Sequence, residues 1–390
     1  MQTGFDLPPP EAGAREHSER VRELVAGRIA AGGGFLSFAD YMDAVLYAPG
    51  FGYYSAGAEK FGAAGDFVTA PELGHVFARC LARVAGAALR QLGGGSILEV
   101  GGGSGALAAD LLLALRGTPP ERYLLLDVSG DLRERQRRAI EARVPEMLHR
   151  VTWLDALPRA PLTGVLLANE VLDALPVERF RIGRDELEQQ GVRIADGGLA
   201  WAARPSPAPL AAAIRHLEVQ LGAPLAEGYT SEIGLRHAPW LRALLASLDR
   251  GLALCIDYGG TRRDVYHPGR QDGTLTCHYR HRRHNDPFVL PGLQDLTAWV
   301  DFSAVAAAAV ESGFEVVAYA TQAHVLLASG ILDDLQAGAD EVDPRRLREM
   351  QEVQRLLLPG EMGERFKVLA LARGFTPDSP LTVRDLRDRL

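Results

Sequence analysis

Short apolar runs recur along the chain from residue 97 onward, and alanine-rich or amphipathic stretches of helical length separate most of them. A short apolar run bounded by turn residues is typical of a buried strand. The predicted strands are Ile97–Val100, Tyr123–Asp127, Val151–Leu154, Val165–Ala168, Leu252–Asp257, Phe314–Ala320 and Phe366–Ala372. Helices between such strands predict a mostly parallel, doubly wound sheet of the α/β class, in which the last two strands can form an antiparallel edge.

Two long stretches interrupt this alternation. Residues 177–250 contain a predicted hairpin from Phe180 to Trp201 and a helix over Ala208–Leu221, and residues 260–302 form the second interruption. Insertions of this size at the carboxyl ends of strands usually form the substrate side of a site. The predicted organisation is an N-terminal arm and helix (1–34, helix Arg20–Ala31), an accessory segment (35–92), a core (93–176, 251–259 and 303–390) and two inserted acceptor-side segments (177–250 and 260–302).

The most informative segment is Ser96–Gly105, where an apolar strand breaks into glycines before a helix predicted over Ala106–Leu115. Glycines at positions 101, 103 and 105 let a ligand approach the backbone closely and leave helix N–H groups to face it. The next predicted strand ends in Asp127, 22 residues after Gly105. A carboxylate at that place can accept both hydroxyls of a ribose. The segment therefore predicts a site for a nucleoside cofactor.

Two nucleoside cofactors fit this geometry. Gly101, Gly103 and Ala106 satisfy the dinucleotide pattern G-x-G-x-x-A. However, Glu99 stands where a dinucleotide strand usually carries an apolar residue, and it opens an E-x-G-x-G-x-G spacing. That spacing resembles motif I of the class I S-adenosylmethionine-dependent methyltransferases. We therefore favour S-adenosylmethionine over a nicotinamide dinucleotide, for which the chain also offers no obvious catalytic His, Lys or Tyr.

A second polar group follows the strand that ends at Ala168. Asn169 and Glu170 come at its carboxyl end, and Asp173 lies three residues further on. In a doubly wound sheet this end faces the ligand, so these side chains are the candidate catalytic residues. The competing interpretation is that Asn169 and Asp173 cap a following helix.

Residues 65–72 form a third candidate segment, a shaped loop that leads into a helix beginning near Pro71. Thr69 is a possible N-cap, and Glu72 falls in the first helical turn, where a carboxylate is favourable. The same loop and helix start can also cover a cofactor. The candidate cofactor contacts of this segment are Gly65, Asp66, Thr69, Pro71 and Glu72.

Composition narrows the class of protein. The net charge of −8 argues against nucleic-acid binding through the overall charge of the protein. The three cysteines are far apart and odd in number, which suits a reducing compartment. No run is long and apolar enough to span a membrane. The N-terminal segment has no apolar core typical of a signal peptide, and its acidic residues are not typical of a mitochondrial transit peptide. The Ala, Arg and Gly bias is typical of a GC-rich bacterial genome. We expect a bacterial enzyme located in the cytoplasm.

Further motifs identify a resemblance. The chain resembles the MidA-type family, the bacterial and mitochondrial methyltransferases that include the assembly factor of respiratory complex I. The segments that carry it, beside Glu99–Gly105 and Gly65–Glu72, are Phe38–Met42, Leu46–Tyr54, Asn169–Val177, Ile256–Gly259, Gly273–Leu275, His284–Pro287, Pro291–Thr297, Val300–Phe302 and Gly363–Val368. The similarity covers nearly the whole chain after residue 35. Two positions depart from the family pattern: Asp127 replaces a glutamate, and Ala78 stands where a glycine is usual.

The resemblance implies a class I methyltransferase fold and S-adenosylmethionine as methyl donor. For the mitochondrial member it implies an arginine acceptor in the complex I subunit that faces the quinone pocket. Asp155, after the third core strand, joins the cofactor candidates Glu99, Gly101, Gly103, Gly105, Asp127 and Asn169. The candidates on the acceptor side are Glu232, Asp257, Tyr258 and His284.

Other interpretations stay open. The chain could be an assembly chaperone that binds a partner subunit and keeps a vestigial or structural cofactor site. Cys277, His278, His281 and His284 lie within eight residues, but their spacing matches no zinc framework and arginines surround them, so no metal is expected. The oligomeric state is open, with a homodimer as one option.

Overall fold

The computed structural model describes residues 7–55, 69–127, 129–336 and 344–390. The chain forms two compact units. The core unit comprises Val68–Leu172, Trp240–Gly260 and Phe302–Leu390, and the accessory unit comprises Met1–Phe67, Asp173–Pro239 and Thr261–Asp301. Within the described ranges, no helix is both long and apolar enough to cross a bilayer.

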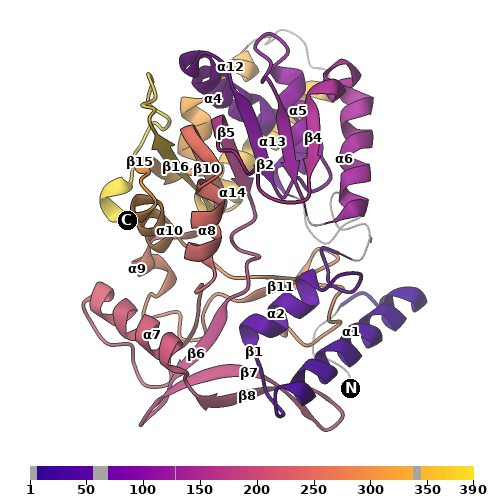
Figure 1. Cartoon of the computed structure of the whole chain (residues 1–390), viewed down its shortest axis with the longest axis vertical. Coiled ribbons are helices and arrows are strands. Elements are labelled where there is room, and N and C mark those ends of the chain that lie inside the picture. Colours follow the sequence, from indigo (N-terminus) through magenta and orange to yellow (C-terminus); the bar gives the residue numbers. More distant parts are fainter. Residues whose placement is uncertain (1–6, 56–68, 128, 337–343) are drawn as a thin grey trace. The chain divides into compact units, whose positions relative to one another are not determined.

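Seven strands of the core unit lie side by side along one sheet (Figure 1). They are β2 (Ser96–Val100), β3 (Tyr123–Leu126), β4 (Val151–Leu154), β5 (Leu162–Asn169), β10 (Leu248–Gly260), β15 (Glu315–Thr321) and β16 (Phe366–Arg373). Their order is β15-β16-β10-β5-β2-β3-β4, and β16 runs antiparallel to both of its neighbours while the pairs from β10 to β4 are parallel. All seven predicted strands are therefore present, and the last two form the predicted antiparallel edge.

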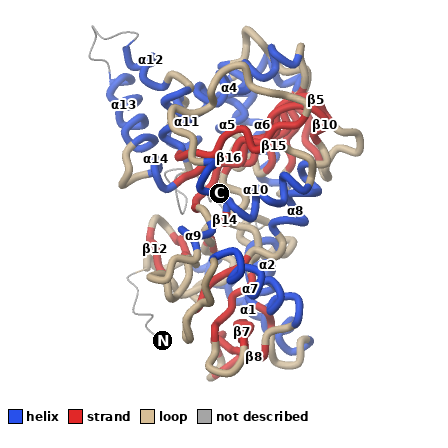
Figure 2. The backbone as a smooth tube through the Cα atoms, turned by 90° about the vertical axis from the view of Figure 1, so that its left-hand side faces the viewer, coloured by secondary structure: helices blue, strands red, loops and turns tan. Residues whose placement is uncertain are grey.

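Helices accompany these strands (Figure 2). Those that begin in the core unit are α3 (Ala70–Leu73), α4 (Val76–Leu92), α5 (Ala106–Ala114), α6 (Gly130–Arg143), η1 (Pro145–Arg150), α10 (Phe302–Glu311), α11 (Gln322–Ala328), α12 (Ile331–Gln336), α13 (Pro344–Leu357), α14 (Met362–Arg365) and η2 (Arg387–Arg389). Helix α8 (His237–Leu245) spans a boundary of the units. Because side chains alternate across a strand, each strand contributes to two layers. Val165 and Leu167 of β5 pack with α4 and α5 in one apolar cluster, whereas Tyr319 of β15 contacts Phe302 of α10.

The accessory unit has its own sheets and apolar clusters. Its elements are α1 (Ala12–Ala31), β1 (Leu36–Ser37), α2 (Phe38–Tyr47), β6 (Glu178–Ile182), β7 (Leu187–Ala195), β8 (Gly198–Pro205), α7 (Ala208–Leu221), β9 (Thr230–Ile233), α9 (Arg262–Val265), β11 (Thr276–Tyr279), β12 (Arg282–His284), β13 (Asp295–Thr297) and β14 (Val300–Asp301). One sheet has the order β1-β7-β6-β9 with β8 beside β7, and the other has the order β12-β11-β13. The hairpin and the helix predicted for residues 177–250 are both present, as β6 to β8 and α7.

The prediction of an N-terminal arm up to about residue 20 is wrong from Ala12 onward. Helix α1 already begins at Ala12, and it buries one narrow stripe formed by Ser18, Val21, Val25 and Ile29. The Ser18 hydroxyl donates a 3.0 Å hydrogen bond to the carbonyl of Pro291, 273 residues away. This partner is far away in sequence, and the stripe is narrow, so the first turns of the helix have little local sign in the sequence.

Candidate functional site

The glycine loop lies between β2 and α5, as predicted. Gly101, Gly103 and Gly105 adopt φ values of 69°, 52° and 88°, a region that side chains disfavour. A Cβ at Gly105 would lie 2.5 Å from the Cα of Gln136, and one at Gly101 would lie 2.9 Å from Cγ2 of Val171. The loop therefore requires glycine both for its backbone conformation and for the close approach of neighbouring segments.

Glu99 is a buried carboxyl group at the start of this loop. It is 2% exposed, and its Oε2 accepts a 2.5 Å hydrogen bond from the hydroxyl of Tyr123 on the neighbouring strand. Burial raises the pKa of Glu99 to about 7; the Tyr123 hydrogen bond opposes this rise and the charge of Asp127 adds to it. The group can therefore change protonation near neutral pH when a cationic ligand group approaches.

Asp127 comes directly after β3 and is held by its neighbours. Its Oδ1 accepts the N–H of Ser129 at 3.1 Å, and its Oδ2 accepts Nε2 of Gln136 at 3.0 Å. The same Gln136 Nε2 lies 3.1 Å from the carbonyl of Gly103, and its Oε1 accepts the indole N–H of Trp153 at 2.9 Å. Gln136 thus joins the glycine loop, the predicted ribose acid and β4. Gln136 is not among the predicted site residues, although it lies between Leu132 and Ile140 on the buried stripe of α6.

Asp155 follows β4 on the surface. Its side chain is 92% exposed and accepts a 2.6 Å bond from Arg133 Nη1. Arg133 Nη2 also donates to the carbonyls of Leu154 and Asp127, at 2.9 and 3.0 Å. Arg133 therefore ties together the chain segments that leave β3 and β4, and it places Asp155 beside Asp127.

Asn169 and Glu170 leave the carboxyl end of β5 in an unusual conformation. Glu170 has φ 54°, and its N–H donates to the carbonyl of Ile256 at 2.8 Å. Its Oε1 accepts Nδ2 of Asn169 at 3.2 Å and the N–H of Ala70 at 3.4 Å. The Oδ1 atom of Asn169 is buried and has no hydrogen-bond partner among the residues that the structure describes. A non-glycine residue in this region marks a functional-site candidate, because such a conformation is uncommon.

The loop before α3 is only partly described. Gly65 and Asp66 lie outside the described residues. Thr69 precedes α3 as its N-cap residue, but its side chain makes no capping hydrogen bond, and Pro71 stands in the first turn. The hydroxyl of Ser104 donates a short hydrogen bond to Oε1 of Glu72, which joins α3 to the glycine loop.

Asp257 holds the chain segment that follows Glu170. It is 0% exposed, and its Oδ2 accepts the N–H groups of Val171 and Leu172 at 3.1 and 2.7 Å. Its Oδ1 accepts the N–H of Tyr258 at 2.8 Å, and Tyr258 itself is half-buried. No helix begins between Asn169 and β6: a turn connects Val171 to that strand. The helix-cap interpretation of Asn169 and Asp173 is therefore wrong.

The remaining candidates belong to the accessory unit. Asp173 is its first residue after the core, and its carbonyl accepts the N–H of Ala298 at 3.0 Å. Glu232 is buried and is bound to Nη1 of Arg179 and, at 2.7 Å, to the N–H of Thr274. His284 is buried on β12, and burial lowers its pKa.

The accessory unit also contains a hollow of about 500 Å³. Its lining residues are Arg179, Ala200, Trp201, Asp272, Leu275, Asn285, Asp286 and Phe288. Arg179 reaches Oδ1 of Asp272 at 2.6 Å, and its Cζ lies 5.2 Å from the centroid of the Trp201 ring. The carboxylate of Asp272 and the ring of Trp201 are therefore already in contact with the guanidinium of Arg179. Among the described residues, no group of three or more His, Cys, Asp or Glu side chains is arranged to hold a metal ion.

The core site provides the groups that S-adenosylmethionine needs. A carboxylate has acceptor capacity on both oxygens, so Asp127 can accept ribose hydroxyls beside its two existing bonds. The buried Oδ1 of Asn169 needs a donor, which an ammonium or amino group can supply. Glu99 can balance a positive charge, and the glycines leave the backbone accessible. The residues present therefore fit this cofactor.

The sheet order and the site together define a class I methyltransferase. A model of the family described as "Putative S-adenosyl-L-methionine-dependent methyltransferase" matches residues 80–320. A protein of Burkholderia thailandensis, with a crystal structure that contains S-adenosyl-homocysteine, is 43% identical with a TM-score of 0.92. The match covers 99% of this chain and 100% of that one.

Curated relatives give the same assignment at lower identity. The "Protein arginine methyltransferase NDUFAF7 homolog, mitochondrial" of Drosophila melanogaster is 27% identical, over 94% of this chain and 88% of the relative. The "Protein arginine methyltransferase NDUFAF7, mitochondrial" of Danio rerio is 28% identical, over 91% and 87%. The chain belongs to this MidA-type family of S-adenosylmethionine-dependent methyltransferases.

Proposed function

We propose that the protein transfers a methyl group from S-adenosylmethionine to an arginine side chain of an acceptor protein. The acceptor would be a subunit of respiratory complex I, such as the subunit facing the quinone pocket, or of a related assembly, as the family resemblance implies. The observation that carries the arginine assignment is the Glu170 carboxylate, which Asn169 and Ala70 hold at the carboxyl end of β5. The names of the curated relatives support the same choice.

For this reaction the protein has to align the acceptor nitrogen with the methyl group and to remove a proton from the guanidinium. When bound, S-adenosylmethionine would supply a methyl group that an acceptor nitrogen can attack directly, with S-adenosyl-homocysteine as the neutral leaving group. A guanidinium is protonated at neutral pH and forms bidentate pairs with carboxylates. Glu170 would therefore orient the acceptor guanidinium and take up its proton, while Asn169 and Asp173 complete the catalytic group.

The cofactor contacts that we assign are those the sequence suggested. Glu99 and the loop of Gly101, Gly103 and Gly105 would receive the methionyl part. Asp127 would bind the ribose, with Asp155 near the base and the segment Gly65, Asp66, Thr69, Pro71 and Glu72 covering the site. The accessory unit would bind the acceptor protein.

The acceptor-side candidates would then have different roles. Asp257 would shape the site, because its carboxylate is occupied by backbone N–H groups. Glu232 would do the same, since it already pairs with Arg179. Tyr258 and His284 stay as candidates for direct contact with the acceptor.

The test is a transfer assay with S-adenosylmethionine labelled on the methyl group. The full-length protein is incubated with a cell extract from a strain that lacks it, and labelled proteins are digested and sequenced by mass spectrometry. We expect label on arginine nitrogen in a single acceptor. Label on lysine or carboxylate would contradict the arginine assignment. Tight binding of S-adenosyl-homocysteine with no transfer to any protein would favour the assembly-chaperone interpretation.

A further inference from the structure

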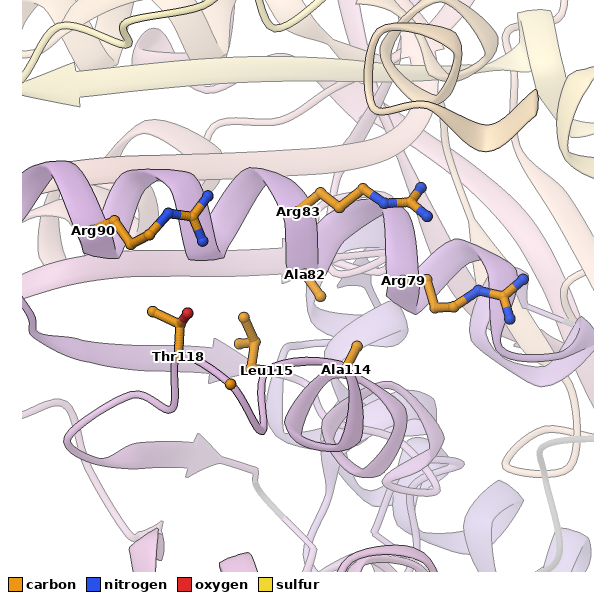
Figure 3. A pocket seen from close by; sticks show the side chains of 8 residues that line it. Arg79, Ala82, Arg83, Arg90, Ala114, Leu115 and Thr118 are labelled. Carbon is orange, nitrogen blue, oxygen red and sulfur yellow. The ribbon is translucent and has the colours of Figure 1, made fainter. Parts of the chain in front are cut away.

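A second hollow lies in the core unit, between α4 and the turn that follows α5 (Figure 3). Its volume is about 350 Å³, which is within the range of small-molecule sites. Arg79, Arg83 and Arg90 of α4 line one side, and Ala114, Leu115 and Thr118 line the other. No residue of the glycine loop, β5 or β10 contributes to it.

The three arginines form a stripe along the helix. At about 100° per residue, positions 79, 83, 86 and 90 fall within roughly 60° of one another around the helix axis. Arg79 and Arg90 are separated by eleven residues, or about 16 Å along the axis. Position 86 is a glycine, and a Cβ there would lie 3.1 Å from Cδ2 of Leu115 and 3.4 Å from Nη1 of Arg90. The glycine thus lets the side chains of Leu115 and Arg90 lie close to the helix backbone in the middle of the stripe.

The charge of this hollow is unbalanced. Its lining includes three arginines and no acidic residue, although the whole chain has a net charge of −8. Nη1 of Arg79 pairs with Glu349 at 3.2 Å. Nη1 of Arg83 donates to the carbonyls of Ser329 and Gly330 at 3.0 and 3.1 Å. These contacts fix two of the guanidinium groups. The guanidinium of Arg90 has no hydrogen bond to any residue that the structure describes.

We propose that this hollow binds a small ligand with two or more phosphate groups. Phosphate oxygens match the guanidinium fork, and every phosphate group in a linked chain carries at least one negative charge near neutral pH. Because the arginines are spread over three helical turns, a single phosphate cannot reach all of them, whereas linked phosphates can. The Thr118 hydroxyl offers a further donor on the facing side. Ala114 and Leu115 add no negative charge on that side of the hollow.

Calorimetric titration of the full chain with sodium tripolyphosphate tests this site. We expect saturable binding that weakens as the salt concentration rises, because salt screens exposed charges. Arg90→Gln should weaken it about tenfold, since one charge-assisted contact is lost. Ala114→Glu should abolish it by placing a carboxylate among the arginines. Arg215→Gln on α7 is the matched control, because it removes an exposed arginine in the other unit.

Three results would overturn the proposal: no saturable binding of tripolyphosphate, an equal loss of affinity in Arg215→Gln, or tighter binding of a hexaglutamate peptide than of tripolyphosphate. The last would identify an acidic peptide site instead. S-adenosyl-homocysteine affinity in Arg90→Gln serves as the folding check and should equal that of the wild type. The binding of tripolyphosphate does not depend on which protein accepts the methyl group.

Discussion

The hydroxyl of Tyr123 donates a 2.5 Å hydrogen bond to the carboxyl group of Glu99, and both side chains are buried in adjacent parallel strands of the core sheet. The bond supplies one partner to a carboxylate that burial would otherwise leave without solvation. Even so, burial raises the pKa of Glu99 to about 7, so the ligand-free protein holds a proton there under mildly acidic conditions. The Glu99 carboxyl can therefore provide a negative charge to a cationic ligand near neutral pH. The same burial lowers the stability of the folded protein at high pH, where Glu99 is ionised.

The first prediction concerns this pH dependence. Because the pKa of Glu99 is raised on folding, from 4.5 to about 7, the folded protein binds the proton more tightly than the unfolded chain. The contribution of Glu99 to stability is complete below about pH 4.5 and is lost as the pH rises through about 7. Relative to Glu99→Gln, wild-type protein should therefore lose stability between pH 5 and pH 8.

Urea unfolding midpoints of the two proteins at several pH values measure this difference. Tyr123→Phe should steepen the wild-type trend, since it removes the hydrogen bond that lowers the Glu99 pKa. Equal pH dependence in wild type and Glu99→Gln would show that the carboxyl group does not titrate in this range.

The second prediction concerns the ribose acid. Asp127→Asn should weaken the binding of S-adenosyl-homocysteine by about 10- to 100-fold, because charge-assisted bonds to the ribose hydroxyls contribute roughly 1.5–3 kcal/mol. Isothermal titration calorimetry measures the change. Asp131→Asn is a matched control, since Asp131 is exposed in the first turn of α6. Unchanged affinity in Asp127→Asn would remove Asp127 from the cofactor site.

The third prediction concerns Gln136, which joins Asp127, Gly103 and Trp153 and is 0% exposed. Gln136→Leu keeps the volume but leaves buried polar partners unsatisfied, at about 1–3 kcal/mol each. We expect a lower melting temperature together with weaker S-adenosyl-homocysteine binding. Ile140→Val, on the same buried stripe, is the control for packing: it should lower the melting temperature slightly and leave binding unchanged. If both variants reduce binding in proportion to stability, Gln136 has no positioning role.

Local patterns in the sequence account for the sheet and for part of the site. Seven apolar runs predict the seven core strands, and the glycines at 101, 103 and 105 predict the loop because their positive φ values are a local requirement. Alternation and turn chemistry act over a few residues, so they are visible in one sequence.

The features of the site that could not be predicted from the sequence depend on contacts between distant segments. Asp257 binds the N–H groups of Val171 and Leu172 from 86 and 85 residues away, and this turn replaces the helix that Asn169 and Asp173 were expected to cap. The role of Gln136 could be predicted only in part. Its spacing from Leu132 and Ile140 indicates that it faces inward, but the sequence does not indicate its three hydrogen-bond partners. Such partners are fixed only when the sheet assembles.

The last prediction concerns Glu170, whose carboxylate we assign to the acceptor guanidinium. Glu170→Gln keeps the side-chain shape, and the amide oxygen can still accept the N–H of Ala70 and Nδ2 of Asn169. Only the negative charge and the capacity to accept a proton are lost. Methyl transfer to protein should therefore fall about 100-fold, a magnitude typical of a missing general base. S-adenosyl-homocysteine binding should be nearly unchanged, because the cofactor contacts assigned to Glu99 and Asp127 stay intact.

Single-turnover transfer of labelled methyl and calorimetric titration separate these two effects. Glu315→Gln, an exposed glutamate at the start of β15, is the charge-matched control and should transfer at the wild-type rate. A partial return of Glu170→Gln activity at higher pH would support the role in proton removal, because more of the acceptor guanidine is then neutral. Near-normal transfer by Glu170→Gln at neutral pH would exclude Glu170 from orienting the acceptor, and Asp173 would become the first carboxylate to test in its place.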